Sequence, residues 1–136
     1  MEKIKISSEK YAVLPKEAID LWSKLGWGCK KDYQEESIKN ALKNTSFIVS
    51  ARNKNNDLVG LARVLSDGVI NTTVADIVVD PEYQGKGVGT KMMEKIKEKY
   101  KNTGIYLEAF KENSFFFEEC GYIKRNNMKV FSKKFN

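Results

Sequence analysis

Three glycines stand at alternate positions, 85, 87 and 89, with Lys86 between the first two. Residues 74–79 before them are rich in β-branched side chains and predict a buried strand, and the residues after them carry apolar side chains at helical spacing. The first turn of a helix has unpaired backbone N–H groups and the positive end of the dipole, so it attracts anions. Glycine has no Cβ to keep a phosphate away, and Lys86 adds a cation. The spacing therefore predicts a phosphate-binding turn between a strand and a helix.

Two familiar phosphate-binding motifs do not match this turn. A P-loop requires four residues between its first glycine and a Gly-Lys-Ser/Thr sequence, whereas Lys86 is followed by Gly87. The dinucleotide fingerprint Gly-x-Gly-x-x-Gly, counted from Gly85, ends on Thr90. That fingerprint also belongs to the first strand and helix of its domain, whereas about half of this chain comes before the glycines. The turn is therefore of another kind.

Residues 84–89, Gln-x-x-Gly-x-Gly, resemble the acetyl-CoA motif of the GNAT family of N-acetyltransferases, Gln/Arg-x-x-Gly-x-Gly/Ala between a strand and a helix. Residues 79–84, Val-Asp-Pro-Glu-Tyr-Gln, are similar to the run that commonly leads this motif. Residues 113–122 look like the family's later pattern Asn-x-x-(x)-Phe-Tyr-x-x-x-Gly-Phe. The resemblance is strongest over 74–101. It implies transfer of an acetyl group from acetyl-CoA to a primary amine, of a small molecule or a protein, by direct attack.

In the family that this chain resembles, two parallel strands separate and the pantetheine arm of the cofactor lies in the gap. The resemblance implies that backbone groups of Ile77 and Val79 pair with the pantetheine, while their side chains belong to the core. The amides of residues 85–90, with Gln84 at the entrance, would hold the pyrophosphate, and residues of the later motif would contact the cofactor from the far side. The implied acetyl-CoA-binding residues are Ile77, Val78, Val79, Gln84, Gly85, Lys86, Gly87, Val88, Gly89, Thr90, Asn113 and Phe116.

Acetyl transfer to an amine needs a base, and Asp76 and Glu108 are the catalytic candidates for that role. Asp76 lies on the predicted central strand among β-branched residues, where burial raises the pKa of a carboxylate and suits it to act as a base. The alternative is that Asp76 pairs with the backbone or with Arg63 and shapes the pocket. The resemblance implies that a backbone N–H in the 77–78 region faces the oxyanion.

The tyrosine that the family commonly places near the thioester sulfur aligns with Phe117, which has no proton to give. Three alternatives stay open: water protonates the leaving thiolate, Tyr122 or Tyr106 takes the role, or the protein is an acyl-CoA-binding sensor or regulatory module without efficient turnover. A free thiol has a pKa of about 8.5, so solvent can protonate the thiolate at neutral pH. We therefore expect an active enzyme with a weak or absent general acid, and Tyr122 is the candidate donor.

Aromatic side chains follow the first predicted helix. Trp27 lies between two glycines, and the resemblance implies that this segment faces the acceptor pocket. The alternative is a hydrophobic plug over the core. With Tyr33 and Asp67, Trp27 fits an aromatic amine, a polyamine or an antibiotic equally well, so the sequence leaves the acceptor open.

The 136 residues are 41% hydrophobic and 31% charged, which is typical of a globular protein, and we expect one domain, 1–136. No apolar run could span a membrane and the N-terminus lacks a signal-peptide pattern, so we expect a cytoplasmic protein without a membrane partner. The net charge of +6 comes from lysines scattered among glutamates, which argues against a nucleic-acid partner. Histidine is absent and Cys29 and Cys120 are far apart, so we expect ordinary thiols and no metal site.

Periodicity and turn signals predict an α/β (α+β) domain with a mixed, mostly antiparallel central sheet and flanking helices. One strand pair should be parallel, joined by a right-handed crossover and, by the resemblance, splayed as in the GNAT fold. Asp32 is expected to cap the second helix. The last strand would pair within the sheet or across a homodimer. The expected strands are 3–6, 46–51, 58–65, 71–79, 105–110 and 128–133, and the expected helices are 15–25, 32–43, one beginning after the glycines, and 113–119.

Overall fold

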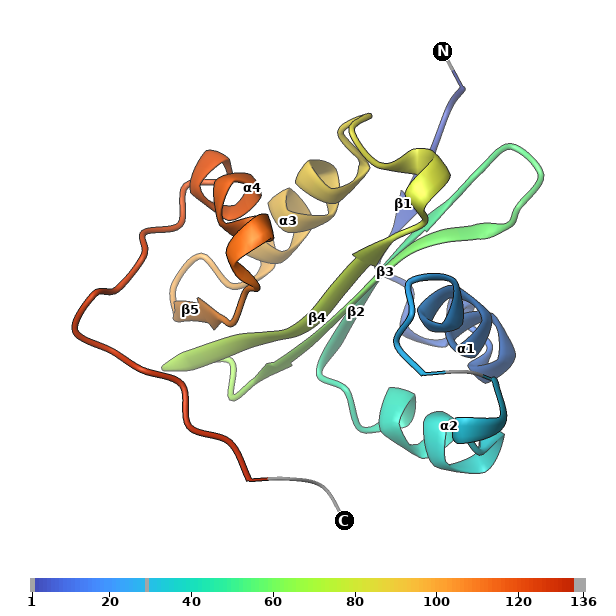
Figure 1. Ribbon diagram of the computed structural model, residues 1–136, viewed down its shortest axis with the longest axis horizontal. Coiled ribbons are helices and arrows are strands. Elements are labelled where there is room, and N and C mark those ends of the chain that lie inside the picture. Colours follow the sequence, from blue (N-terminus) through green and yellow to red (C-terminus); the bar gives the residue numbers. More distant parts are fainter. Residues whose placement is uncertain (1, 29, 134–136) are drawn as a thin grey trace.

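The computed structural model describes residues 2–28 and 30–133. Five strands form one sheet in the order β1-β2-β3-β4-β5, and only the last pair is parallel (Figure 1). The predicted mixed, mostly antiparallel sheet is thereby confirmed. Strands β2, β3 and β4 follow one another through short polar turns, which place β4 between β3 and β5. The strands are β1 (Lys5–Ser7), β2 (Phe47–Arg52), β3 (Leu58–Ser66), β4 (Asn71–Val79) and β5 (Gly104–Leu107).

Helices cover both faces of the sheet. On one face lie α1 (Pro15–Lys24) and α2 (Glu35–Lys43), and on the other lie α3 (Val88–Lys99) and α4 (Ser114–Glu119) (Figure 1). Pro15 suits the first position of α1, where its missing N–H has no intrahelical partner to lose. Helix α3 carries the chain from β4 to β5, as predicted, but it begins at Val88, so Gly85 and Gly87 precede the helix and Gly89 lies in its first turn.

The strands supply two apolar cores, because alternate side chains point to opposite faces. On β2, Ile48 packs toward α1 while Val49 packs toward α3, and both are almost completely buried. The α3 side is filled by fully buried methionine and isoleucine side chains of that helix, and the α1 side by leucines and Trp22. The sheet is therefore held between two packed layers, and the positions along β4 are fixed from both sides.

The structure corrects two expectations. The predicted strand at 128–133 is wrong, because these residues have no regular structure and the side chains of Met128, Val130 and Phe131 are exposed. An extended segment becomes a strand only where a sheet edge accepts its backbone hydrogen bonds, and this segment pairs with no described strand. The second helix begins at Glu35 with Gln34 as its N-cap, while Asp32 lies in a separate 3₁₀ turn, Lys30–Asp32.

Cys29 lies outside the described residues. Among the residues that the structure describes, no helix combines the length and the apolar character that crossing a membrane requires.

Candidate active site

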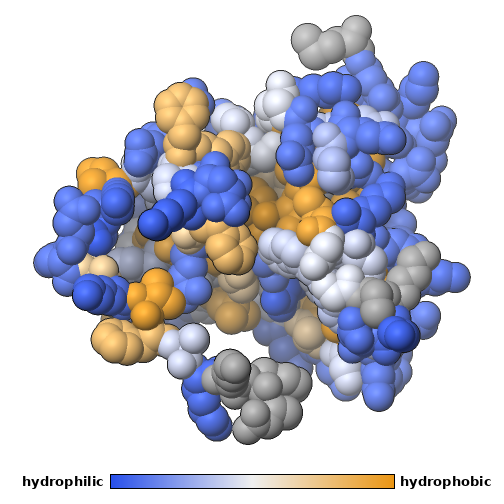
Figure 2. All heavy atoms as spheres, in the orientation of Figure 1, coloured by the Kyte–Doolittle hydropathy of each residue, from blue (hydrophilic) through white to orange (hydrophobic). Residues whose placement is uncertain are grey.

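Strand β5 covers only the first half of β4. The two strands pair from Asn71, opposite Gly104, to Val74, opposite Leu107, where β5 ends. The second half of β4, residues 75–79, pairs with β3 alone. Figure 2 shows a hollow between the half of the molecule that carries α3 and α4 and the half that carries α1 and α2, with hydrophobic atoms at its floor. The parallel pair therefore opens into a gap along the second half of β4.

The backbone of this open half presents hydrogen-bonding groups to the gap. In an antiparallel pair, successive residues direct their backbone groups alternately toward the neighbouring strand and away from it. The Asp80 N–H donates to the Val59 carbonyl of β3 at 2.8 Å, so the backbone groups of Ile77 and Val79 face away from β3. The Gln84 side-chain amide donates to the Val79 carbonyl at 2.9 Å, in agreement with this direction. Ile77 and Val79 thus form the free edge that the resemblance implies, and Gln84 occupies one of its acceptors.

The glycine turn is anchored at its start by Asp80. This nearly buried carboxylate accepts a hydrogen bond from the Glu82 N–H at 3.0 Å and forms an ion pair with Lys24 of α1 at 2.8 Å. Burial raises the pKa of Asp80, but the contacts with Lys24 and the Glu82 N–H together hold it below its ordinary value. Gly87 then serves as the N-cap of α3 with φ of 83°, a left-handed conformation that glycine adopts without strain.

The first turn of α3 is open to a ligand. No side chain of the described residues caps it, so the N–H groups of residues 88–90 have no partner within the helix. Residues 85–87 are exposed beside them. On the far side, a Cβ atom at Gly89 would lie only 3.0 Å from the ring of Phe116, which shows how closely α4 packs on this turn. Asn113 is exposed at the start of α4. Gly89 and Phe116, two of the implied cofactor residues, therefore lie together next to Val79 at the end of β4.

Asp76 points to the α1 face because a bulge shifts the register of β4. Arg63 pairs with Asp76 while Val64 pairs with Val74, which leaves Ala75 as the extra residue. The guanidinium of Arg63 donates twice to Asp76 Oδ2, at 2.9 and 2.6 Å. Asp76 Oδ1 is buried and has no hydrogen-bond partner among the described residues. Burial raises the pKa of Asp76, and Arg63 opposes the rise without cancelling it. One carboxylate oxygen is thus held while the other can still accept a proton.

Aromatic rings line the space next to this ion pair. The Arg63 guanidinium carbon lies 5.9 Å from the ring centroid of Trp22, and the ring of Tyr33 is 5.7 Å from that of Trp22. The Tyr33 hydroxyl donates a hydrogen bond to the Trp27 carbonyl. A series of contacts through Arg63, Trp22 and Tyr33 thus leads from Asp76 to the Trp27 backbone on the α1 face. Sequence reasoning missed Trp22 as a member of this group, because its spacing in α1 marks it only as a core residue.

The other catalytic candidates lie elsewhere. Glu108 is exposed just beyond the end of β5, and Tyr106 on β5 is half-exposed. Tyr122 packs on the α3 side of the sheet, where burial and the neighbouring Cys120 raise the pKa of its phenol. Phe117 packs into the same core with its ring 5.0 Å from that of Phe116. The structure thus places Tyr122 and Phe117 on the opposite face of the sheet from the Asp76 carboxylate.

Asp67 belongs to a turn rather than to this site. Its Oδ1 accepts hydrogen bonds from three successive backbone N–H groups, those of residues 69–71, at 2.7 to 3.2 Å. These bonds lower the pKa of Asp67. Because residue 71 starts β4 and residue 79 ends it, Asp67 lies at the opposite end of the strand from the glycine turn. Asp67 is therefore not part of the group around Asp76 and does not help to identify the acceptor.

A cavity of about 370 Å³ lies between β1 and the start of α1 and is lined by Lys5, Ser50 and Arg52, among others. We do not assign it to the acetyl-transfer chemistry, since it is remote from the open half of β4 and Glu17 neutralises Arg52 there. Within residues 2–28 and 30–133, no cluster of acidic and cysteine side chains could hold a metal ion.

Comparison with known proteins points to one family. A model of the acetyltransferase (GNAT) family matches residues 14–122. An uncharacterized N-acetyltransferase, ycf52, of Pyropia yezoensis is 35% identical over 95 residues, which are 65% of this chain and 55% of that protein. Serotonin N-acetyltransferase 2 of Oryza sativa subsp. japonica is 35% identical over 75 residues, which are 53% of this chain and 38% of that protein. The chain thus spans about half the length, or less, of these curated relatives.

Solved structures share the fold. The "probable acetyltransferase" SA2161 of meticillin-resistant Staphylococcus aureus superposes with a TM-score of 0.84 at 21% identity, over 98% of this chain and 100% of that one. Glucosamine-6-phosphate N-acetyltransferase of Arabidopsis thaliana superposes with a TM-score of 0.74 at 19% identity, over 99% and 100% of the two chains. At these identities the likeness establishes the architecture alone.

Proposed function

The chain belongs to the acetyltransferase (GNAT) family, and from that premise we propose that it transfers an acetyl group from acetyl-CoA to a primary amine. The observation that carries this proposal is the half-open β4 with the glycine turn at its end. Such an edge offers paired backbone donors and acceptors to the amides of pantetheine, and the uncapped start of α3 offers N–H groups to a pyrophosphate. One elongated ligand with amides at one end and phosphates at the other fits both features.

The acceptor amine would enter from the α1 face, where Asp76 lies. Asp76 Oδ1 takes the proton that the amine must lose, because its pKa is raised by burial and its partner Arg63 occupies only Oδ2. The amine nitrogen forms a bond to the thioester carbonyl carbon and the carbon–sulfur bond breaks. The product is an acetylated amine and a thiolate, which becomes the thiol of CoA by gaining one proton. Trp22, Tyr33 and Trp27 would form the wall that orients the acceptor.

Solvent is the proposed source of the proton for the thiolate. Phe117 cannot supply it, and the Tyr122 phenol lies on the opposite face of the sheet from Asp76. Phe117, at the position where the family commonly has a tyrosine, also motivates the second candidate function, an acyl-CoA-binding regulatory module without efficient turnover. Release of free thiol from acetyl-CoA, measured over a panel of amines, separates the two, because only the enzyme releases thiol in an amine-dependent way.

The melting temperature with and without acetyl-CoA tests the cofactor assignment. Ligand at 100 times its Kd should stabilise the wild-type protein by about 2.7 kcal/mol, a shift of several degrees for a domain of this size. Gly87→Asp should abolish the shift, since it places a negative charge at the proposed pyrophosphate site. Gly87→Asn is the matched control, because asparagine imposes a similar backbone strain at φ of 83° without the charge.

The outcomes are distinct. A shift for wild type and for Gly87→Asn, with none for a folded Gly87→Asp, supports the site. If millimolar acetyl-CoA leaves the wild-type melting temperature unchanged, the glycine turn does not bind the cofactor and the proposal fails.

A further inference from the structure

Tyr83 joins the glycine turn to a distant part of the chain. It ends the short 3₁₀ turn Pro81–Tyr83 between β4 and the glycines. Its hydroxyl accepts a hydrogen bond from the Asn53 side-chain amide at 3.1 Å, and its ring lies under the Lys86 ammonium, 5.4 Å from the ring centroid. Asn53 belongs to the β2–β3 turn, residues 53–57, some 30 residues earlier in the chain. One aromatic side chain therefore connects that turn with the cation of the glycine turn.

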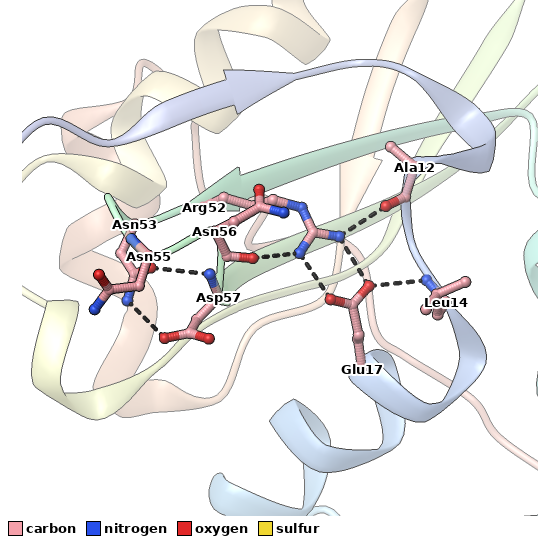
Figure 3. Close-up of polar contacts among 8 residues, drawn as sticks. All are labelled: Ala12, Leu14, Glu17, Arg52, Asn53, Asn55, Asn56 and Asp57. Carbon is pink, nitrogen blue, oxygen red and sulfur yellow. Dashed lines mark hydrogen bonds and ion pairs between the residues drawn. The ribbon is translucent and has the colours of Figure 1, made fainter.

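The Asn53 side chain is held in a single orientation (Figure 3). Its Oδ1 accepts hydrogen bonds from the backbone N–H groups of Asn55 and Asp57, at 3.0 and 2.9 Å. Its Nδ2 donates to the Asp57 carboxylate at 3.2 Å as well as to Tyr83. Because Oδ1 faces backbone donors, the amide group cannot be reversed without losing both bonds. The turn therefore presents a fixed donor to the Tyr83 hydroxyl.

Arg52 connects the β2–β3 turn to α1. The guanidinium donates to the Asn56 carbonyl at 2.9 Å and forms a two-pronged ion pair with Glu17, at 2.7 and 2.8 Å (Figure 3). It also donates to the Ala12 carbonyl at 2.7 Å. The hydrogen bond from Arg52 is the main reason why the pKa of Glu17 lies below its ordinary value. A two-pronged arginine–carboxylate pair restricts rotation more than a single contact does, so the turn has a rigid base.

We propose that the β2–β3 turn is a positioning device for cofactor binding: it fixes Tyr83, whose ring holds the Lys86 ammonium beside the glycine turn, where the acetyl-CoA pyrophosphate binds. Lys86 is the residue that touches the ligand, and Tyr83 and Asn53 act through it. A free lysine loses much side-chain freedom on binding, whereas a lysine already held over an aromatic ring loses less. This inference depends on the proposed acetyl-CoA site. It explains how the Lys86 ammonium of that site is already ordered before acetyl-CoA binds.

Binding of acetyl-CoA to Tyr83→Leu tests the ring. Loss of an exposed cation–π contact should raise the Kd about two- to fivefold. Lys86→Met should raise it by at least as much, and the double variant should be no worse than Lys86→Met, because the ring acts only through the lysine. Tyr83→Phe keeps the ring but loses the hydrogen bonds of the hydroxyl with Asn53 and with Glu2, the latter at 3.4 Å, so its Kd should fall between those of wild type and Tyr83→Leu. Tyr11→Leu and Lys95→Met, both exposed substitutions outside the site, are the matched controls.

Two readouts separate positioning from a general structural defect. With a saturating amine, Tyr83→Leu should raise the KM for acetyl-CoA and leave kcat unchanged. It should also leave the KM for S-acetylpantetheine, which has no pyrophosphate, as in wild type. Additive effects of Tyr83→Leu and Lys86→Met, or equal losses with S-acetylpantetheine, would overturn the inference. A wild-type Kd for Tyr83→Phe would also overturn it, because the β2–β3 turn acts on Tyr83 through the hydroxyl. Failure of the wild-type protein itself to bind acetyl-CoA would instead refute the proposed function.

Discussion

The two halves of β4 belong to one strand but have different neighbours. In the first half, paired with β3 and β5, the fully buried Thr72 hydroxyl lies 2.8 Å from Ser66 Oγ and 2.7 Å from Thr103 Oγ1. In the second half, paired with β3 alone, Asp76 Oδ1 has no partner among the described residues and backbone groups face the gap. Buried polar groups without partners reduce stability. The comparison indicates that the closed half supports the fold and that the open half retains unpaired groups for a ligand.

The strongest test of this division removes the proposed base, Asp76, from the open half. Asp76→Asn should lower kcat by about 10²- to 10⁴-fold, the usual contribution of a positioned general base. Its affinity for acetyl-CoA should stay near that of wild type, because the proposed cofactor site uses the free backbone edge of β4 and not the Asp76 side chain. Steady-state rates and the Kd from calorimetry give the two quantities. Thr72→Val is the control in the closed half and should leave kcat unchanged. Equal losses of rate in both variants would refute the division.

The closed half should respond in stability instead. Thr72→Val keeps the shape of the side chain but leaves the Ser66 and Thr103 hydroxyls without their shared partner, which should lower the free energy of unfolding by about 1–3 kcal/mol. Urea denaturation at neutral pH measures the change. A Thr72→Val protein as stable as wild type would show that the hydroxyl cluster does not support the fold.

The pH dependence of kcat/KM tests the role of Asp76 in the open half. Because burial raises the pKa of Asp76, kcat/KM should increase with pH through a value above the ordinary aspartate pKa of about 3.9. Arg63 opposes this rise, so Arg63→Met should move the acidic limb of the profile to higher pH. Asp76→Asn should abolish the limb. A limb that stays in place in Arg63→Met would show that another group titrates.

The free energy of unfolding should also depend on pH through Asp76, and the direction of that dependence follows from its raised pKa. The folded-state pKa of Asp76 lies above its unfolded value, so the neutral carboxyl is favoured in the fold and its contribution is lost as pH rises through the folded pKa. Wild type should therefore lose stability relative to Asp76→Asn over that interval. Urea denaturation of both proteins at several pH values between 4 and neutral, chosen around the ordinary aspartate pKa of about 3.9, would show the difference.

The sequence could predict the features that depend on local residue spacing, but not those that depend on strand register or on a free sheet edge. The glycine turn, its preceding strand and its following helix depend on local spacing, so Gly87 and the strand before it were placed correctly. The position of Asp76 depends on a bulge at Ala75, which places the carboxylate opposite Arg63 on the face of the sheet that carries Trp22. No local sequence pattern marks that register shift. Likewise 128–133 has the alternation of a strand, but whether a strand forms depends on an available edge.

The smallest expected effect is that of Phe117→Tyr. A tyrosine here would restore the family's pattern, yet Phe117 packs in the α3-side core against Phe116, on the other face of the sheet from Asp76. The added hydroxyl should therefore change kcat by less than about twofold, since a thiol with a pKa of about 8.5 is protonated by solvent at neutral pH. Thiol release with an active amine measures the rate, and the Kd for acetyl-CoA serves as the control. A rise of tenfold or more would show that the α3 face reaches the reacting sulfur, and the separation between the two faces of the open half would then have to be abandoned.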